Sequence, residues 1–223
     1  MQNIMLQHFT GEMGELHRRS QASIAAYAEQ HGAEYRLLSG NVFHPDLSPP
    51  CQKLAMLGEE FDQHGIVVMV DTDMFVRKGG SASIFEADGI GISGPFQRRL
   101  KWRNIRKFNG IFHWRYPYWG GAVWRLTREQ RQRLRRHLPK VDLARYNNGR
   151  FEDEGVMHQL ARHEGMTNHV LPGGDRWALG SYETERWDDA VFVHIRPRAA
   201  RKGPRKAKID VLDDLVARGL IEA

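Results

Sequence analysis

GIVVMVDTDMFV, residues 65–76, decides the fold class, because it joins a run of apolar, β-branched residues to a pair of acids. The apolar run predicts a buried strand. Asp71 and Asp73 follow it with one residue between them. Because side chains alternate along a strand, we expect both carboxylates on the same side, about 6.6 Å apart along the backbone.

Two carboxylates held this close repel each other unless a cation lies with them. The carboxyl end of a strand is also where open α/β sheets bind their ligands. Asp71 and Asp73 therefore predict a divalent metal and the phosphates that it would hold. Hard carboxylate oxygens suit magnesium or manganese. The alternative is a pair of aspartates that only terminates the strand in a turn.

The segments around this stretch predict an α/β fold with a mostly parallel sheet, since the chain begins with a strand, a helix and a second strand. The predicted strands are 3–9, 34–38, 66–70, 89–93, 170–171 and 190–194, and 118–126 is predicted as a loop that runs into a strand. The predicted helices are 15–30, 51–63, 128–137, 152–164 and 209–217. Helix signals include Gly32 after the first helix and Thr127 as an N-cap. We expect a single domain over 1–208, followed by a C-terminal helix within 209–223.

Basic residues are concentrated in two predicted loops, 96–107 and 196–208. The second loop alone carries seven positive charges, more than the net charge of +6 of the whole chain. Such loops are either solvated surface or sites for anions such as phosphates, nucleic acid or an acidic glycan. They also allow peripheral contact with a membrane surface.

The bulk composition favours a globular, cytoplasmic protein of 223 residues with a substantial core. No apolar run approaches the ~20 residues that span a bilayer, and the amino terminus lacks the pattern of a signal peptide. Cys51 is the only cysteine, which excludes an internal disulfide and a cysteine-based zinc site.

Three further segments carry candidate chemistry. His194 ends a late apolar strand, where a histidine is either a structural residue or a metal ligand that would favour manganese. Gly120 and Gly121 are either a plain turn or a place where a ligand approaches the backbone. The acids at 152–154 are either a favourable first helical turn or a source of general-base or electrostatic catalysis.

The order of these segments resembles that of GT-A fold glycosyltransferases, which adopt a Rossmann-like single domain. The resemblance is to metal-dependent families that use nucleotide sugars, such as the galactosyl- and glycogenin-like transferases. It rests on VMVDTDMFV at 68–76, WGGAVW at 119–124, FEDEG at 151–155 and VFVHIRP at 191–197, and it extends from residue 3 to about 205. The asparagine common in the glycine segment and the HxxGxxKPW pattern after the histidine are absent, which leaves the stereochemistry open.

The resemblance implies that the chain moves a sugar, most simply a hexose with retention, from a nucleoside-diphosphate sugar to an acceptor hydroxyl. Asp73 and His194 would bind Mn²⁺ or Mg²⁺ directly, and Asp71 would contact the ribose or the metal through water. Asp153 and Glu154 would act on the acceptor hydroxyl or stabilise the developing cation. The implied donor-binding residues are Phe9, Thr10, Gly11, Lys53, Asp71, Gly120, Gly121, Arg196 and Lys202. The acceptor would be a glycan or another hydroxyl compound, including an acidic one.

Two other functions stay open. Phosphatases of the haloacid-dehalogenase type also end a strand in DxD and use the first aspartate as nucleophile. Phe75 and the position of Asp71 after a complete βαβ unit disfavour this reading, although Asp175 or 188–189 could supply its late acidic motif. A basic nucleic-acid-binding protein is the second alternative, with Trp102 stacking on bases. It leaves the paired aspartates unexplained, so we do not expect a nucleic-acid partner.

Overall fold

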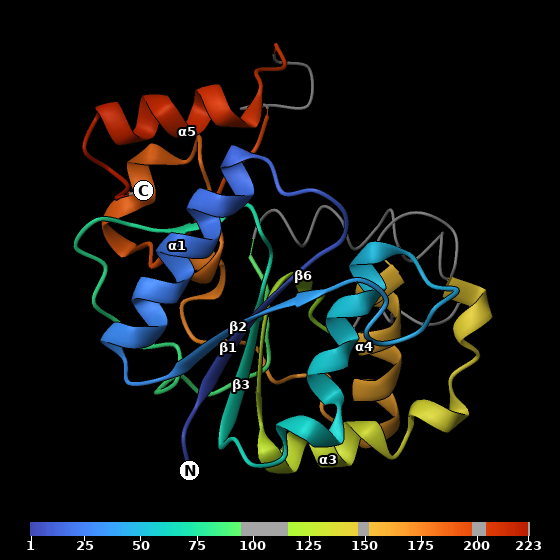
Figure 1. Ribbon diagram of the computed structural model, residues 1–223. Helices are drawn as coiled ribbons and strands as arrows, with labels where there is room; N and C mark the ends of the chain where they lie inside the picture. The colour runs from blue at the N-terminus through green and yellow to red at the C-terminus, as the bar shows by residue number, and fades with distance from the viewer. Residues whose placement is uncertain (95–115, 147–151, 198–203, 223) are drawn as a thin grey trace.

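Five strands form the central sheet of the computed structural model, which describes residues 1–94, 116–146, 152–197 and 204–222 (Figure 1). Their order is β2-β1-β3-β6-β5. The bounds are β1 Ile4–Phe9, β2 Glu34–Ser39, β3 Ile66–Val70, β5 Gly91–Ile92 and β6 Gly120–Thr127. β1 pairs in parallel with β2 and β3, whereas β6 runs antiparallel to both β3 and β5. The predicted α/β fold with a mostly parallel sheet is thus confirmed, with β6 as its reversed strand.

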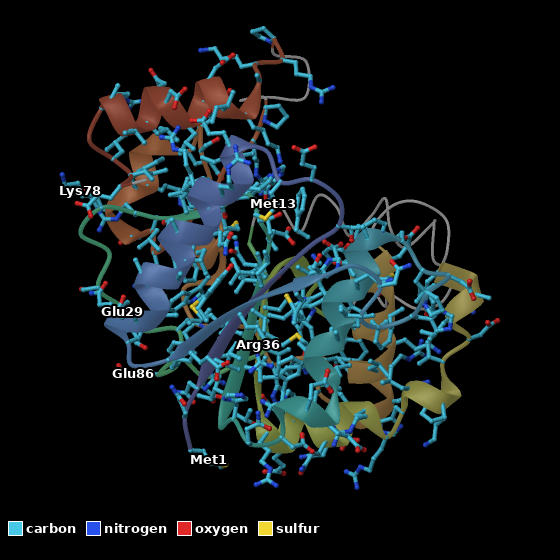
Figure 2. The ribbon with its side chains drawn as sticks, in the orientation of Figure 1. Met1, Met13, Glu29, Arg36, Lys78 and Glu86 are labelled. Carbon is cyan, nitrogen blue, oxygen red and sulfur yellow. The ribbon has the colours of Figure 1, made fainter. Side chains whose placement is uncertain are left out.

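Helices cover both faces of this sheet (Figure 1). Helix α1 (Glu15–Gln30) packs on one face, and the 3₁₀ helix η1 (Pro49–Leu57) and helix α4 (Glu152–Glu164) pack on the other. Alternation along the strands divides the core accordingly. Ile4 belongs to the η1 and α4 side, and its neighbour Met5 to the α1 side. Side chains fill both spaces between helices and sheet (Figure 2).

The predicted ends of two helices are confirmed. α1 and α4 span the predicted residues 15–30 and 152–164, and Gly32 adopts the left-handed backbone conformation that follows α1. Helix α3 (Arg128–Arg135) begins at a complete capping box, in which Thr127 and Gln130 satisfy each other's backbone N–H groups. Two short 3₁₀ helices, η3 (Leu138–Lys140) and η4 (Leu143–Tyr146), follow α3.

The predicted helix 51–63 is wrong in type. The segment consists of η1 and a second 3₁₀ helix, η2 (Glu59–Phe61). Two prolines begin η1, and Gly58 ends it in an extended conformation while its N–H bonds the carbonyl of Ala55, three residues back. Every side chain from 51 to 57 is buried, so packing rather than an amphipathic stripe determines this segment. The predicted strand at 170–171 is only an isolated bridge between Val170 and Gly91.

A second, three-stranded sheet lies beside the first and has the order β4-β8-β7. It contains β4 Met74–Val76, β7 Leu179–Gly180 and β8 Phe192–His194, with the 3₁₀ helices η5 (Gly174–Trp177) and η6 (Thr184–Asp189) in the connections. The predicted C-terminal helix is present as α5 (Lys208–Ala217), and it packs beside α1 (Figure 1). In the described ranges no helix is long and apolar enough to cross a membrane.

Candidate functional site

Asp71 and Asp73 lie in the connection between the two sheets. β3 ends at Val70, so neither aspartate is part of the strand, and the predicted reason for their proximity, alternation along a strand, does not apply. The N–H of Asp71 still donates to the carbonyl of Ala122 on β6, at 2.9 Å. After Asp73 the chain enters β4 and the small sheet. The turn that changes sheets therefore presents both carboxylates.

β8 brings His194 to the same turn. Met74 and His194 are register partners in the antiparallel pair β4–β8, and the N–H of Ile195 donates to the carbonyl of Asp73 at 3.0 Å. This pairing places Nε2 of His194 3.3 Å from Oδ1 of Asp73. One ligand atom from each of Asp71, Asp73 and His194 lies within 4.8 Å of the others, and all three residues are partly exposed.

The donor set fits a divalent metal. Two carboxylates and an imidazole are ligands for manganese or magnesium, and the imidazole favours manganese. Nδ1 of His194 is buried and has no hydrogen-bond partner among the described residues, so no hydrogen bond from them fixes the orientation of this ring on that side. Among the described residues, no other group of three potential ligands comes this close together.

Lys208, the first residue of α5, forms an ion pair with Oδ2 of Asp73. Burial alone would raise the pKa of Asp73, but the charges and hydrogen bonds of His194 and Lys208 outweigh it and hold that pKa well below its usual range. Lys208 was not among the site residues predicted from the sequence. Lys208 is one of seven basic residues in 196–208, and no local signal separates it from the others.

Lys53 joins Asp71 to the acidic helix α4. Its Nζ lies 2.7 Å from Oδ1 of Asp71, 2.7 Å from Oδ2 of Asp153 and 2.8 Å from the carbonyl of Gly121. Burial opposes the charge of this ammonium, but the two carboxylates together raise the pKa of Lys53. The structure thus places Lys53 against three protein oxygens, and its contact with a donor stays a prediction.

Asp153 and Glu154 both face the glycine segment at the start of β6. Oε1 of Glu154 accepts the N–H of Gly121 at 2.7 Å. A Cβ atom at Gly121 would lie 2.6 Å from Oδ2 of Asp153, so a glycine is needed here for the approach of the two acids. Burial and the nearby charge of Asp71 raise the pKa of Asp153 against the opposing effect of Lys53. The predicted catalytic roles of both acids remain predictions.

The end of β1 lies near the same cluster. The ring centroids of Phe9 and His17 are 4.3 Å apart. Burial lowers the pKa of His17, the charge of Asp73 raises it, and the charge of Lys208 lowers it further. Thr10 and Gly11 are exposed, and Gly11 has a φ of +92° that favours glycine. The contact of Phe9, Thr10 and Gly11 with a nucleotide remains a prediction.

Arg196 follows β8 and donates its backbone N–H to Oγ of Ser181 at 3.1 Å. Burial lowers the pKa of its half-buried guanidinium, while Glu183 and Asp73 oppose that shift. Arg196 therefore lies within electrostatic reach of Asp73. Lys202 and the basic loop 96–107 lie outside the described residues.

Comparison with known proteins supports the fold and not a particular family. No protein-family model matches the chain, and no curated protein matches it. A solved structure that matches is described as the "crystal structure of a glycosyltransferase involved in the glycosylation of the major capsid of PBCV-1". It is 14% identical, the match covers 97% of this chain and 100% of that one, and the TM-score is 0.57. The chain has a fold similar to that glycosyltransferase over nearly its whole length.

Proposed function

We propose that the protein is a metal-dependent glycosyltransferase that moves a sugar from a nucleoside-diphosphate sugar to an acceptor hydroxyl. The observation that carries the proposal is the convergence of Asp71, Asp73 and His194 at the carboxyl end of β3. This is the edge at which open α/β sheets bind ligands. The similarity in fold to a glycosyltransferase supports the same reaction class.

Asp73 and His194 are proposed as direct ligands of Mn²⁺ or Mg²⁺, with Asp71 on the nucleotide side. Such a metal supplies Lewis-acid stabilisation of the departing diphosphate. Arg196 is proposed to add positive charge near the same oxygens, because it lies within electrostatic reach of Asp73. The donor nucleotide would then extend toward Phe9 and the loop after β1, with Gly120 and Gly121 along its sugar.

We propose Asp153, rather than Glu154, for proton transfer. Its raised pKa makes its carboxylate a stronger base than an exposed aspartate. Glu154 is engaged by the N–H of Gly121, so we propose that it positions the glycine segment under the donor sugar. The transferred group is proposed to be a hexose, with retention at the anomeric carbon, on the resemblance to GT-A enzymes alone.

The phosphatase alternative gains no support from the described residues. It requires a late acidic motif near Asp71, for which Asp175 was a candidate. Asp175 instead forms a two-pronged ion pair with Arg186, at 2.6 and 2.9 Å, and it is not part of the Asp71 cluster. The other candidates for this motif, Asp188 and Asp189, are exposed and are not part of the Asp71 cluster either.

Calorimetric titration of nucleoside diphosphates with and without Mn²⁺ tests the proposal. We expect one nucleotide to bind only when Mn²⁺ is present, and Asp73→Asn to abolish that binding. Asp142→Asn is the control, since it removes an exposed carboxylate between η3 and η4. Release of the diphosphate from the matching sugar nucleotide would then be measured with candidate acceptors. Hydrolysis of phosphate esters that depends on Asp71, without nucleotide binding, would instead establish the phosphatase.

A further inference from the structure

Both carboxylate oxygens of Asp73 already have partners within the protein. Oδ1 faces Nε2 of His194, and Oδ2 forms an ion pair with Nζ of Lys208. The two residues of that ion pair are 135 positions apart in the sequence, and the side chain of Asp73 is only 16% exposed. A divalent cation that binds Asp73 therefore has to share this carboxylate with two internal partners.

Lys208 occupies the position of a cation at the predicted metal site. An ammonium group and a divalent metal repel each other, and two cations compete when they use the same small carboxylate. The ring of His194 can act as a co-ligand of a metal, whereas Lys208 cannot while it is charged. Of the two partners of Asp73, Lys208 is thus the one that a metal would displace.

The packing of α5 allows that displacement without loss of the helix. Val211, Leu212 and Leu215 are buried in a cluster with Leu16 of α1 and Phe75 of β4, which anchors the middle of α5. The chain beyond α5 is tied down as well, because the N–H of Lys78 donates to the carbonyl of Leu220 at 2.9 Å. Figure 2 shows Lys78 close to this carboxyl-terminal end of the chain.

The first residues of α5 have fewer anchors, because Ile209 is only partly buried against this cluster. Residues 204–207 are exposed, and the N-cap residue Ala207 provides no side-chain hydrogen bond. Before the helix, the N–H of Lys206 donates to the carbonyl of Pro197 at 2.9 Å. Within the described residues, the ion pair of Lys208 with Asp73 is therefore a main side-chain contact that holds the first turn of α5 in place.

We propose that Lys208 is an internal competitor of the metal: it holds Asp73 in the metal-free protein and is displaced when a divalent cation binds, which loosens the first turn of α5. This inference rests on the proposed metal-dependent function. It assigns α5 a role that extends beyond packing, since metal binding and the position of its amino-terminal turn become coupled. The displaced ammonium stays at the mouth of the site, where it can meet an anionic ligand.

Mn²⁺ titration of the wild-type protein and of Lys208→Met tests the competition. Methionine keeps much of the length of the side chain but neither its charge nor its hydrogen bond, so we expect Mn²⁺ to bind roughly three- to thirtyfold more tightly. Lys206→Met is the matched control, because it removes the same charge from an exposed residue two positions earlier, and its affinity should stay near that of the wild type.

Amide hydrogen exchange supplies the second measurement and needs no variant. Mn²⁺ should speed exchange of the amides of Val211 and Leu212, which bond to carbonyls of the first turn, and leave 214–217 of the wild-type protein unchanged. Lys208→Met could bind Mn²⁺ more tightly only because it has lost a positive charge, but that effect would not change exchange in the wild-type protein. The competition therefore requires both the tighter binding and the faster exchange. Unchanged affinity in Lys208→Met, or unchanged exchange on addition of Mn²⁺, would overturn the competition.

Asp73→Asn separates this inference from the proposed function. Mn²⁺ binding that Asp73→Asn abolishes and Lys208→Met leaves unaltered would overturn the competition alone and keep the metal site. Absence of Mn²⁺ binding from the wild type and from every variant would overturn both the metal-dependent function and the competition.

Discussion

Nζ of Lys53 lies 2.7 Å from Oδ2 of Asp153, and the two side chains are only 9% and 6% exposed. The same ammonium contacts Asp71, so one positive charge holds together the turn after β3 and the start of α4. Two carboxylates share this charge, and one of them, Asp71, is itself a predicted metal ligand. The arrangement connects the stability of the fold with the chemistry of the site.

Lys53→Met should destabilise the protein strongly, because it leaves Asp71 and Asp153 without their buried counterion. Removal of one partner from a buried ion pair costs about 3–5 kcal/mol. The free energy of unfolding from urea titrations followed by circular dichroism would measure the loss. Lys78→Met, at an exposed lysine, is the control and should change stability by less than about 0.5 kcal/mol. A loss below about 1 kcal/mol in Lys53→Met would contradict the inferred role.

Gly121→Ala should disturb the acids rather than the strand. The added Cβ would lie 2.6 Å from Oδ2 of Asp153 and 3.0 Å from Cγ of Glu154, and Lys53 restrains Asp153 from moving away. Overpacking of this kind costs about 1–3 kcal/mol, which thermal unfolding would detect. Gly14→Ser is the control, since serine is a favourable N-cap residue for α1 and its Cβ would meet only His17 at an ordinary 3.8 Å. Equal stability of the two variants would show that Asp153 and Glu154 can move away from the added methyl group, which would contradict the prediction.

His194→Ala should weaken Mn²⁺ binding by at least about tenfold and leave the fold intact, because the ring is a proposed ligand at the end of β8. Calorimetry would give the affinity, and circular dichroism would verify the fold. His169→Ala removes an exposed imidazole and should bind Mn²⁺ as the wild type does. An unchanged affinity in His194→Ala would remove this residue from the site.

Asp62 provides a pH dependence that is separate from the site. Two hydrogen bonds from Arg135, at 2.7 and 3.2 Å, lower its pKa. The folded-state pKa thus lies below the unfolded value of about 3.9, so the ion pair stabilises the protein above that pH and loses its effect as the pH falls through the folded-state pKa.

Asp62→Asn should accordingly be less stable than the wild type at pH 7 by about 0.5–1 kcal/mol. The difference should shrink below about pH 4, as the wild-type carboxyl becomes protonated. Urea titrations at a series of pH values would follow it, with Asp142→Asn as the exposed control. A stability difference between wild type and Asp62→Asn that is independent of pH would contradict the ion-pair explanation.

Local patterns in the sequence predicted much of the fold. The apolar run before Asp71 identified β3, helical spacing with a C-cap signal identified α1, and an acidic first turn marked α4, because these signals act between residues a few positions apart. The same reasoning failed for η1. This segment is a 3₁₀ helix that begins at two prolines and ends at Gly58, and packing buries every side chain from 51 to 57. The reversed direction of β6 likewise depends on its sheet partners, which no local signal specifies.

The sequence by itself determined the chemistry that is available: the aspartates 71 and 73, the strand-terminal His194 and the acids at 153 and 154. Only the tertiary structure decided which of them meet. Lysines look alike in a sequence, yet folding buries Lys53 between two carboxylates and brings Lys208 onto Asp73. Such pairs form between distant segments, because the electrostatic cost of burying a carboxylate is offset by whichever cation the fold places beside it.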